Sequence, residues 1–221
     1  MSQQGTWPGE DRQVVDEVEE ADVAEAEDSE GSEDSEDSDD EDTGGDEPQL
    51  RVADQHAGGE LDVPDDVDLL EGEPQGTRRG VGIVASRFNG EIVNKLLASA
   101  LAELESAGVA REAVTVMAVP GAFELPLGAM ALAKTRRYSC IVALGCVIRG
   151  ETAHFDFVAG EAASGLQLAA LETGVPVAFG VLTVDTVAQA ETRADKGAEA
   201  VRTALEMADL FSQLRATAQA K

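Results

Sequence analysis

The sequence predicts an α/β domain in which a parallel sheet of four strands has helices on both of its faces. Four short runs are apolar at every position, as in strands that are buried on both sides. A helical pattern follows each run, and this alternation is typical of a parallel sheet. Most of the excess negative charge precedes residue 76, so the patterned segment is nearly neutral and long enough to bury a core.

The first half of the domain contains two strand–helix units. Residues 81–85 predict a strand, and the apolar helical face that follows it stops at Gly108. Residues 114–119 predict the second strand, which a Pro-Gly pair ends. The helical pattern over residues 123–134 places Pro126 in the first turn, where proline is tolerated. The apolar face of the first helix consists of Ile92, Val93, Leu96, Leu97, Ala100, Leu101 and Leu104.

The third strand, predicted over residues 140–146, carries both cysteines of the chain. Cys140 and Cys146 are six residues apart on it, so we expect their Cα atoms roughly 20 Å apart. That distance excludes a disulfide, and we expect buried thiols in a reducing compartment. The helix predicted over residues 155–171 ends at Gly174.

The fourth strand is predicted over residues 176–182. Thr186 and Gln189 have capping-box spacing and open the last helical stretch. This stretch runs to about residue 214 with a break near Gly197.

Residues 1–68 predict a disordered acidic extension, and residues 69–221 predict the folded domain. Residues 1–75 hold 29 of the 44 acidic residues and only two basic ones, which leaves a net charge of −1 on the rest. The extension has too little apolar surface to offset the entropy of ordering it. It is either a solvated, solubilising segment or an arm for a basic partner or an assembly surface.

Several classes of protein and location are disfavoured by these patterns. Confinement of the acids to one end argues against halophilic adaptation, and the neutral domain gives no electrostatic basis for nucleic-acid binding. No apolar run is long enough to span a membrane, and the acidic N-terminus lacks the apolar region of a signal peptide. We therefore expect a cytoplasmic protein without a membrane partner.

Four loops should meet at the carboxyl edge of such a sheet: residues 86–90, 120–124, 146–154 and 183–186. They offer two aromatic rings, two carboxylates, a hydroxyl and a histidine, and an arginine follows closely. This set suits a polar heterocycle together with a phosphorylated small molecule. The other histidine lies in the acidic extension, so only the one in the loop is a candidate for proton transfer near neutral pH. The residues are Phe88, Phe123, Glu124, Glu151, Thr152, His154 and Arg193.

Each of these residues also has an ordinary structural interpretation. Phe88 and Phe123 could pack within their loops, and Glu124 could favour a helix N-terminus. Arg193 could be a solvated helix residue, and His154 a hydrogen-bonded structural histidine. The sequence has no dinucleotide-binding fingerprint and no P-loop motif. Two histidines without a nearby ligand cluster predict no metal site.

Five segments, in order and at closely matching spacings over residues 70–217, resemble the 6,7-dimethyl-8-ribityllumazine synthase family. The resemblance implies a flavodoxin-like sheet, a strand near residues 70–73 added to a neighbouring subunit, and homopentamers that in many members form an icosahedral capsid. It implies condensation of 5-amino-6-(D-ribitylamino)uracil with 3,4-dihydroxy-2-butanone 4-phosphate in riboflavin biosynthesis, without metal or organic cofactor. The segments are GIVASRFNGEIV, VPGAFELP, LGCVIRGETAHFDFV, PVAFGVLTVDT and the closing ADKGAEA with ALEMADL.

Carried over residue by residue, the resemblance implies two groups of site residues. Phe88 would stack on the pyrimidinedione, Glu124 would accept hydroxyl hydrogen bonds, and Phe179 would close the ring pocket from the adjacent subunit. Arg193 would clamp the phosphate, and His154 would transfer protons. Further ring-side residues are Ala122, Phe123, Cys146, Val147 and Ile148, the phosphate-side loop holds Glu151 and Thr152, and Asn89 and Lys196 are expected nearby.

Two features depart from the family's pattern. Glu151 stands where many members carry a small residue, and we expect its side chain to point away while its backbone N–H serves the anion. Only Ala194 and Asp195 separate Arg193 from Lys196, where shell-forming members have a longer loop. Because that loop bears on how pentamers meet, the sequence predicts a pentamer more firmly than a capsid.

Three functions stay open on the sequence alone. The first is the enzyme, and the second is a non-catalytic scaffold that binds flavin or lumazine. The third is a container whose acidic extension recruits basic cargo or riboflavin synthase. The joint presence of Phe88, Glu124, His154 and Arg193 favours the enzyme, since a mere binder could lose the histidine first.

Overall fold

The computed structural model describes residue 59 and residues 61–219. Most of the expected extension, residues 1–58 and residue 60, lies outside the described residues, and residues 61–80 contain neither helix nor strand. The elements are β1 (Val81–Ser86), α1 (Gly90–Ser106), η1 (Arg111–Ala113), β2 (Val114–Val119), η2 (Ala122–Glu124), α2 (Leu125–Lys134), β3 (Cys140–Ile148), α3 (His154–Thr173), β4 (Val177–Val184), α4 (Val187–Glu191) and α5 (Lys196–Gln219).

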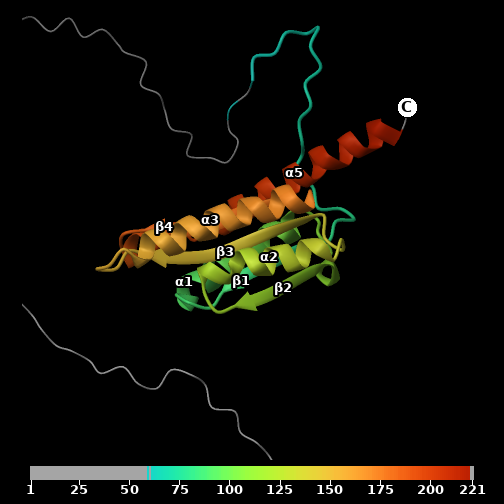
Figure 1. The fold of residues 1–221 in the computed structure, drawn as a ribbon. Helices are drawn as coiled ribbons and strands as arrows, with labels where there is room; N and C mark the ends of the chain where they lie inside the picture. The colour runs from blue at the N-terminus through green and yellow to red at the C-terminus, as the bar shows by residue number, and fades with distance from the viewer. Residues whose placement is uncertain (1–58, 60, 220–221) are drawn as a thin grey trace, which may run out of the picture. The chain divides into compact units, whose positions relative to one another are not determined.

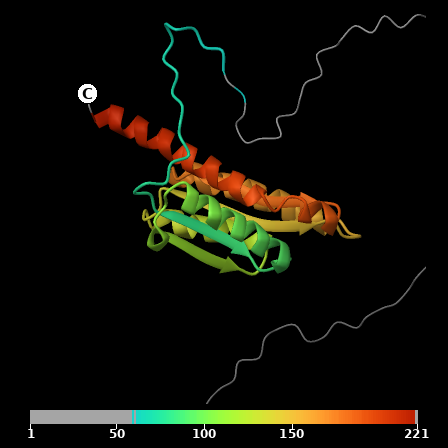
Figure 2. The same ribbon diagram turned by 180° about the vertical axis from the view of Figure 1, so that it is seen from behind.

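The four strands form one parallel sheet in the order β2-β1-β3-β4. Helices α2 and α3 cover one face (Figure 1), and α1 and α5 cover the other, which Figure 2 shows from behind. This arrangement confirms the predicted fold. Because all the strands run the same way, the loops that follow them emerge at one side, called here the carboxyl edge.

Each face of the sheet has its own hydrophobic core. On the central strand β3, Leu144 packs with α1 and α5, whereas Ala143 packs with α2 and α3. Leu96 of α1 and Leu205 of α5 fill the first core, and Leu166 of α3 fills the second. Since successive strand residues point to opposite faces, burial on both faces explains why the strands are apolar at every position.

The predicted helix signals occupy the expected places. Gly174 adopts a left-handed conformation with φ 64° and ends α3, and Gly108, with φ 82°, follows α1. Pro126 is the second residue of α2. The Thr186 hydroxyl accepts a hydrogen bond from the Gln189 N–H, but the Gln189 side chain accepts from the residue before Thr186, so only half of the capping box forms.

Several boundaries differ from the prediction. Strands β3 and β4 each run two residues further than expected, to Ile148 and Val184, because their last residues pair with one another. Helix α5 ends at Gln219, about five residues beyond the predicted end. The break in the last helical stretch covers residues 192–195, and α5 begins at Lys196. Gly197 is therefore a packing residue rather than a breaker: a Cβ there would collide with the carbonyl oxygen of Leu96, where α5 lies against α1.

A buried ion pair ties the segment before β1 to α5. Arg79 Nη2 lies 2.6 Å from Asp209 Oδ1, and both side chains are largely buried. The other oxygen of Asp209 accepts hydrogen bonds from the Glu73 N–H and from the Gln213 amide. Residues 70–73, where the family resemblance implies a strand on a neighbouring subunit, form no strand within this chain's sheet.

This ion pair predicts how stability depends on pH. The Gln213 amide, the Glu73 N–H and the Arg79 guanidinium lower the pKa of Asp209. A lowered carboxyl pKa adds stability above the unfolded-state pKa, and this stability is lost as pH falls through the folded-state pKa. We expect Asp209→Asn to be less stable than wild type at pH 7 by up to about 3 kcal/mol. The gap should shrink below about pH 4.

Thermal unfolding of both proteins between neutral and acid pH measures that gap. Glu105→Gln is the control, because this exposed carboxylate on α1 has no hydrogen bond or ion pair through its side chain in the described part of the chain. If the stability difference between wild type and Asp209→Asn stayed constant down to the lowest pH measured, the lowered pKa of Asp209 would not be its cause.

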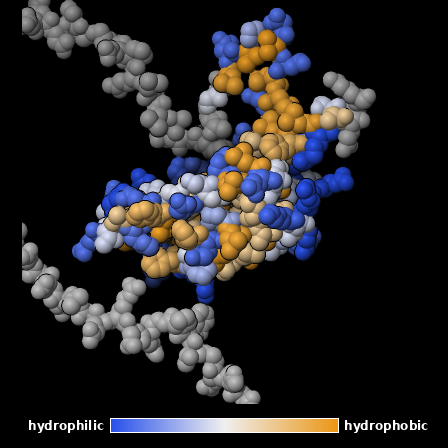
Figure 3. Space-filling model, viewed as in Figure 1, coloured by the Kyte–Doolittle hydropathy of each residue, from blue (hydrophilic) through white to orange (hydrophobic). Residues whose placement is uncertain are grey.

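Large apolar side chains stay exposed on the face that Figure 3 displays, over α2 and α3. Leu127 is 74% exposed, Phe157 68% and Leu171 72%. Exposed apolar surface of this kind is typical of sites that bind another protein or a ligand. In residues 61–219, no helix has both the length and the apolar content needed to cross a bilayer.

Candidate active site

A pocket of about 570 Å³ opens at the carboxyl edge of the sheet. Its walls are the loop after β1, the turn η2 after β2, the end of β3 and the first turns of α3. The volume lies within the usual range for small-molecule sites. Its lining residues are Phe88, Asn89, Gly121, Ala122, Phe123, Glu124, Cys146, Val147, Ile148, Gly150, Thr152, His154, Phe155, Phe157 and Val158.

The pocket gathers most of the predicted site residues. Three of the four loops expected to converge contribute to it, and the loop after β4 does not. The predicted residues outside its lining are Glu151, Phe179, Arg193 and Lys196.

Asn89 shapes the first wall. Its backbone is left-handed, with φ 56° and ψ 41°, a conformation that asparagine tolerates better than most residues. Its side-chain Nδ2 donates a hydrogen bond of 2.9 Å to the carbonyl oxygen of Cys146. The turn is thereby fixed to the end of β3, and the adjacent Phe88 ring stays 70% exposed at the pocket. The Asn-Gly pair at residues 89–90 is the sequence signal for this turn.

The second wall is the turn η2. The Gly121 N–H donates a hydrogen bond of 2.9 Å to Glu124 Oε2, so the carboxylate stabilises its own loop, as the structural interpretation expects. The other oxygen, Oε1, has no partner among the described residues and is free to accept hydrogen bonds from a ligand. Phe123 beside it is 57% exposed.

The third wall is the loop of residues 150–153 with the start of α3. All four loop residues are exposed, and Thr152 Oγ1 accepts a hydrogen bond of 3.4 Å from the His154 N–H. His154 is the first residue of α3, and no hydrogen bond joins its imidazole to another described residue. The ring is therefore available to a ligand in the pocket.

Cys146, near the end of β3, is an unreactive thiol. Burial raises the pKa of Cys146 to about 11 and that of Cys140 to about 12. Both thiols are free and buried, as predicted, and they stay protonated at neutral pH. The end of β3 therefore offers a ligand backbone groups and apolar surface rather than a thiolate.

The described residues that line the pocket include neither lysine nor arginine. Arg193 lies in the segment between α4 and α5, and Lys196 is the first residue of α5. This segment is on the side of the sheet that α1 covers, where the Ser99 hydroxyl of α1 donates to the carbonyl oxygen of Asp195 at 3.5 Å. Arg193 is exposed, and its Nη1 donates to the Gln189 carbonyl oxygen at 2.7 Å. Arg193, the predicted phosphate residue, and Lys196, which was expected nearby, are thus both outside the pocket of their own chain.

Phe179 is also separated from this pocket. It is the third residue of β4, five residues before Val184 ends the strand, roughly 17 Å from the carboxyl edge. Its side chain is 45% exposed. Phe179 therefore cannot close the pocket of its own chain.

Sequence reasoning missed two aromatic residues of the pocket, Phe155 and Phe157. Both belong to the first turn of α3, where the sequence pattern predicts only an apolar-faced helix. A signal was present: four of the six phenylalanines in the chain follow the predicted strands β1 to β3 closely. Such a concentration of scarce rings is typical of a site for a planar ligand.

Comparison with known proteins agrees with this geometry. The family model described as 6,7-dimethyl-8-ribityllumazine synthase matches residues 79–212, which include every residue that lines the pocket. This match covers the sheet and all five helices except the end of α5.

Three curated relatives carry the same description. A 6,7-dimethyl-8-ribityllumazine synthase of Edwardsiella ictaluri is 51% identical over 153 residues, which cover 66% of this chain and 98% of the relative. Those of Yersinia pestis and Yersinia pseudotuberculosis are each 47% identical over 155 residues, covering 67% of this chain and 99% of the relative. About a third of this chain lies outside each of these matches.

Proposed function

The chain belongs to the 6,7-dimethyl-8-ribityllumazine synthase family, and on that premise we propose that the pocket at the carboxyl edge is its catalytic site. The protein condenses 5-amino-6-(D-ribitylamino)uracil with 3,4-dihydroxy-2-butanone 4-phosphate in riboflavin biosynthesis. One observation supports this site most directly: Phe88, Glu124 and His154, which come from three different loops, line one pocket. The names of the relatives do not favour a non-catalytic scaffold.

The aromatic wall takes the uracil. Phe88 stacks on the pyrimidinedione, and the backbone of residues 146–148 meets the edge of the ring. Glu124 Oε1, which has no partner among the described residues, accepts hydrogen bonds from the ribityl hydroxyls. The Glu124–Gly121 hydrogen bond orients that carboxylate before the substrate arrives, which reduces the entropy lost on binding.

The phosphate binds at the loop of residues 150–153, whose backbone N–H groups and Thr152 hydroxyl face it. Glu151 points its carboxylate to solvent, since a second anion beside a phosphate is repulsive. The pocket's own lining supplies no cation, whereas Arg193 and Lys196 lie outside it. We therefore assign Arg193, Lys196 and Phe179 to the pocket of a neighbouring subunit, at a subunit interface. The exposed apolar side chains on α2, α3 and β4 support such an interface.

The residues then serve a reaction that moves several protons. The 5-amino group of the uracil attacks the ketone, water leaves, and an imine forms. Loss of phosphate and rearrangement follow, and attack of the ribitylamino nitrogen on the second carbonyl then closes the ring with loss of a second water. Because both substrates are reactive, most of the acceleration comes from holding them together in the right orientation. His154 gives and takes protons during these steps.

His154→Ala is therefore expected to lower kcat by at most about a hundredfold, the low end of a general acid–base contribution. The measurement is the absorbance of 6,7-dimethyl-8-ribityllumazine as it forms from both substrates. The control is His56→Ala, which removes the other histidine of the chain and should leave kcat unchanged. Complete loss of turnover in a folded, oligomeric His154→Ala protein would contradict the view that holding the two substrates in the right orientation supplies most of the acceleration.

The protein forms oligomers and acts on small-molecule substrates, as its family implies. A pentamer is favoured over a capsid because the segment of residues 194–195 is short. The two free cysteines are in keeping with a cytoplasmic location. Recruitment of riboflavin synthase or another basic partner rests on the charge of residues 1–58 alone. Sedimentation of the full chain and of a chain lacking those residues, with and without riboflavin synthase at low salt, tests assembly and recruitment together.

A further inference from the structure

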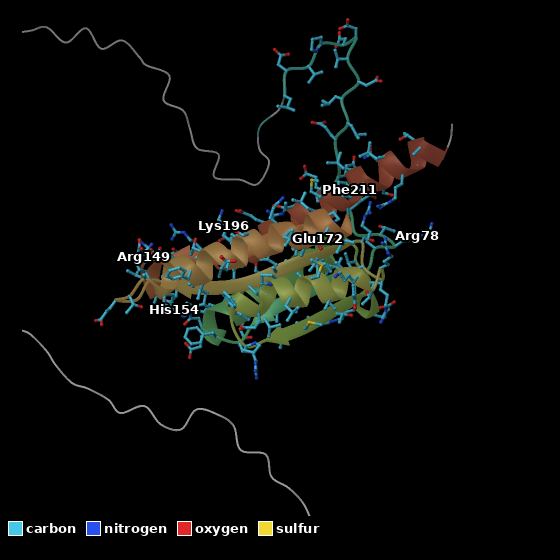
Figure 4. The ribbon with its side chains drawn as sticks, viewed as in Figure 1. Arg78, Arg149, His154, Glu172, Lys196 and Phe211 are labelled. Atoms are coloured by element: carbon cyan, nitrogen blue, oxygen red, sulfur yellow. The ribbon has the colours of Figure 1, made fainter. Side chains whose placement is uncertain are left out.

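Arg149 makes an unusual set of contacts just before the phosphate-side loop. Its Nη1 lies 3.1 Å from Asp156 Oδ1, in the first turn of α3, and its Nε lies 3.1 Å from Oδ1 of Asp185, the residue directly after β4. The guanidinium carbon sits 4.0 Å from the centroid of the Phe155 ring. Figure 4 places Arg149 and His154 at the same end of the domain.

These contacts join the two ends of the loop of residues 150–153. Arg149 precedes that loop, and Phe155 and Asp156 follow it. The loop residues themselves are exposed, and their only side-chain hydrogen bond among the described residues is the one from the His154 N–H to Thr152. The guanidinium also covers one side of Phe155, whose ring lines the pocket. Both carboxylates raise the pKa of Arg149 further above its ordinary value, Asp185 most, so the charge is permanent.

We propose that Arg149 is a positioning residue: it clamps the phosphate-side loop and the His154 turn in their binding geometry without touching the substrate. This inference rests on the proposed role of that loop. Arg149 does not line the pocket, and its Nη1 and Nε each donate to a carboxylate. A planar guanidinium is needed for the task, because it donates in two directions and stacks on a ring at once.

Direct attraction between Arg149 and the phosphate is the competing explanation, and the sign of one effect separates the two. Asp156→Asn removes a negative charge near the loop, so simple electrostatics predicts tighter binding of an anion. The clamp predicts weaker binding, since Arg149 loses one of its anchors. Arg149→Lys keeps the charge but loses the planar group that bridges Asp156 and Asp185 and stacks on Phe155, so only direct attraction predicts that lysine restores binding.

The experiment titrates inorganic phosphate into the full-length oligomeric protein by calorimetry, for wild type, Arg149→Gln, Arg149→Lys and Asp156→Asn. The matched control is Arg87→Gln: this exposed arginine also follows a strand at the carboxyl edge, and its side chain has no hydrogen bond or ion pair in the described part of the chain. Circular dichroism confirms that each variant is folded. The KM for 5-amino-6-(D-ribitylamino)uracil is measured in parallel.

We expect Arg149→Gln and Arg149→Lys to raise the phosphate Kd by about tenfold or more, as misplacement of binding groups does. Asp156→Asn should raise it as well, and adding Asp156→Asn to Arg149→Gln should add little, because the two residues act as a unit. Arg87→Gln should change the phosphate Kd by less than about twofold. The KM for the uracil should change by less than about twofold in every variant.

Unchanged phosphate binding in Arg149→Gln, restoration by Arg149→Lys, or tighter binding in Asp156→Asn would each overturn the clamp. Wild-type protein that fails to bind phosphate would overturn the phosphate-side role of the loop, and the clamp with it. The two failures are distinguishable because only the second affects wild type.

Discussion

Arg193→Ala is expected to raise the KM for 3,4-dihydroxy-2-butanone 4-phosphate about a hundredfold, because one charge-assisted partner of a phosphate contributes up to about 3 kcal/mol. The KM for the uracil substrate should stay close to that of wild type. Steady-state kinetics with each substrate varied in turn measures both values. Arg202→Ala is the control, since this arginine lies one and a half turns into α5 and pairs with Glu103 of α1.

The same variant tests whether each pocket uses two subunits. Phe88→Ala damages the pocket itself, whereas Arg193→Ala damages what a neighbour supplies to it. When the two variants are unfolded, mixed in equal amounts and refolded together, about one pocket in four receives an intact Phe88 and an intact Arg193 from different subunits. Activity of the mixture should then exceed that of either variant alone.

A mixture no more active than its components, in oligomers shown to contain both variants, would place Arg193 in the pocket of its own chain. An unchanged KM for the phosphorylated substrate in Arg193→Ala would remove the residue from phosphate binding altogether.

Gly197→Ala is expected to destabilise the domain by about 3 kcal/mol, and Gly197→Val by more, because the added Cβ collides with the backbone of α1. A backbone carbonyl cannot rotate out of the way as a side chain can, so α5 must move. Lys196 moves with it, and phosphate binding should weaken too. Thermal unfolding should show a midpoint lower by about 10 °C.

Gly160→Ala is the matched control for the added methyl group. Gly160 lies inside α3, and a Cβ there would meet nothing within 4 Å. Alanine is a better helix former than glycine, so this variant should gain up to about 1 kcal/mol. A Gly197→Ala protein as stable as Gly160→Ala would show that α1 and α5 can separate without cost.

Local patterns in the sequence predicted those parts of the fold that depend on local physics. The strands followed from apolar runs, since a run such as residues 140–146 can be buried on both faces only inside a sheet. The end of β3 did not follow, because Val147 and Ile148 stay extended through pairing with β4, a partner far along the chain. Gly197 was misinterpreted for the same reason: its role depends on Leu96 in another helix.

The site residues, too, differ in whether their positions depend on the local sequence or on contacts with distant parts of the chain. The convergence of Phe88, Glu124 and His154 could be predicted, because parallel strands deliver their following loops to one edge. The contacts of Arg149 could not, since Asp185 stands 36 residues away and only the register of β3 and β4 brings it near. The separation of Arg193 from the pocket of its own chain also depends on packing, here against α1.

The two cysteines of β3 have a practical consequence for following the protein in solution. A protonated, buried thiol does not react with an alkylating reagent, so each cysteine becomes modified only when the structure around it opens. Both side chains belong to the core that α1 and α5 cover; Cys140 begins β3, and Cys146 lies near its other end, where it also lines the pocket. Alkylation rates at the two positions, read by mass spectrometry, would therefore compare the opening of this core at its pocket end and at its opposite end, in the unmodified native sequence.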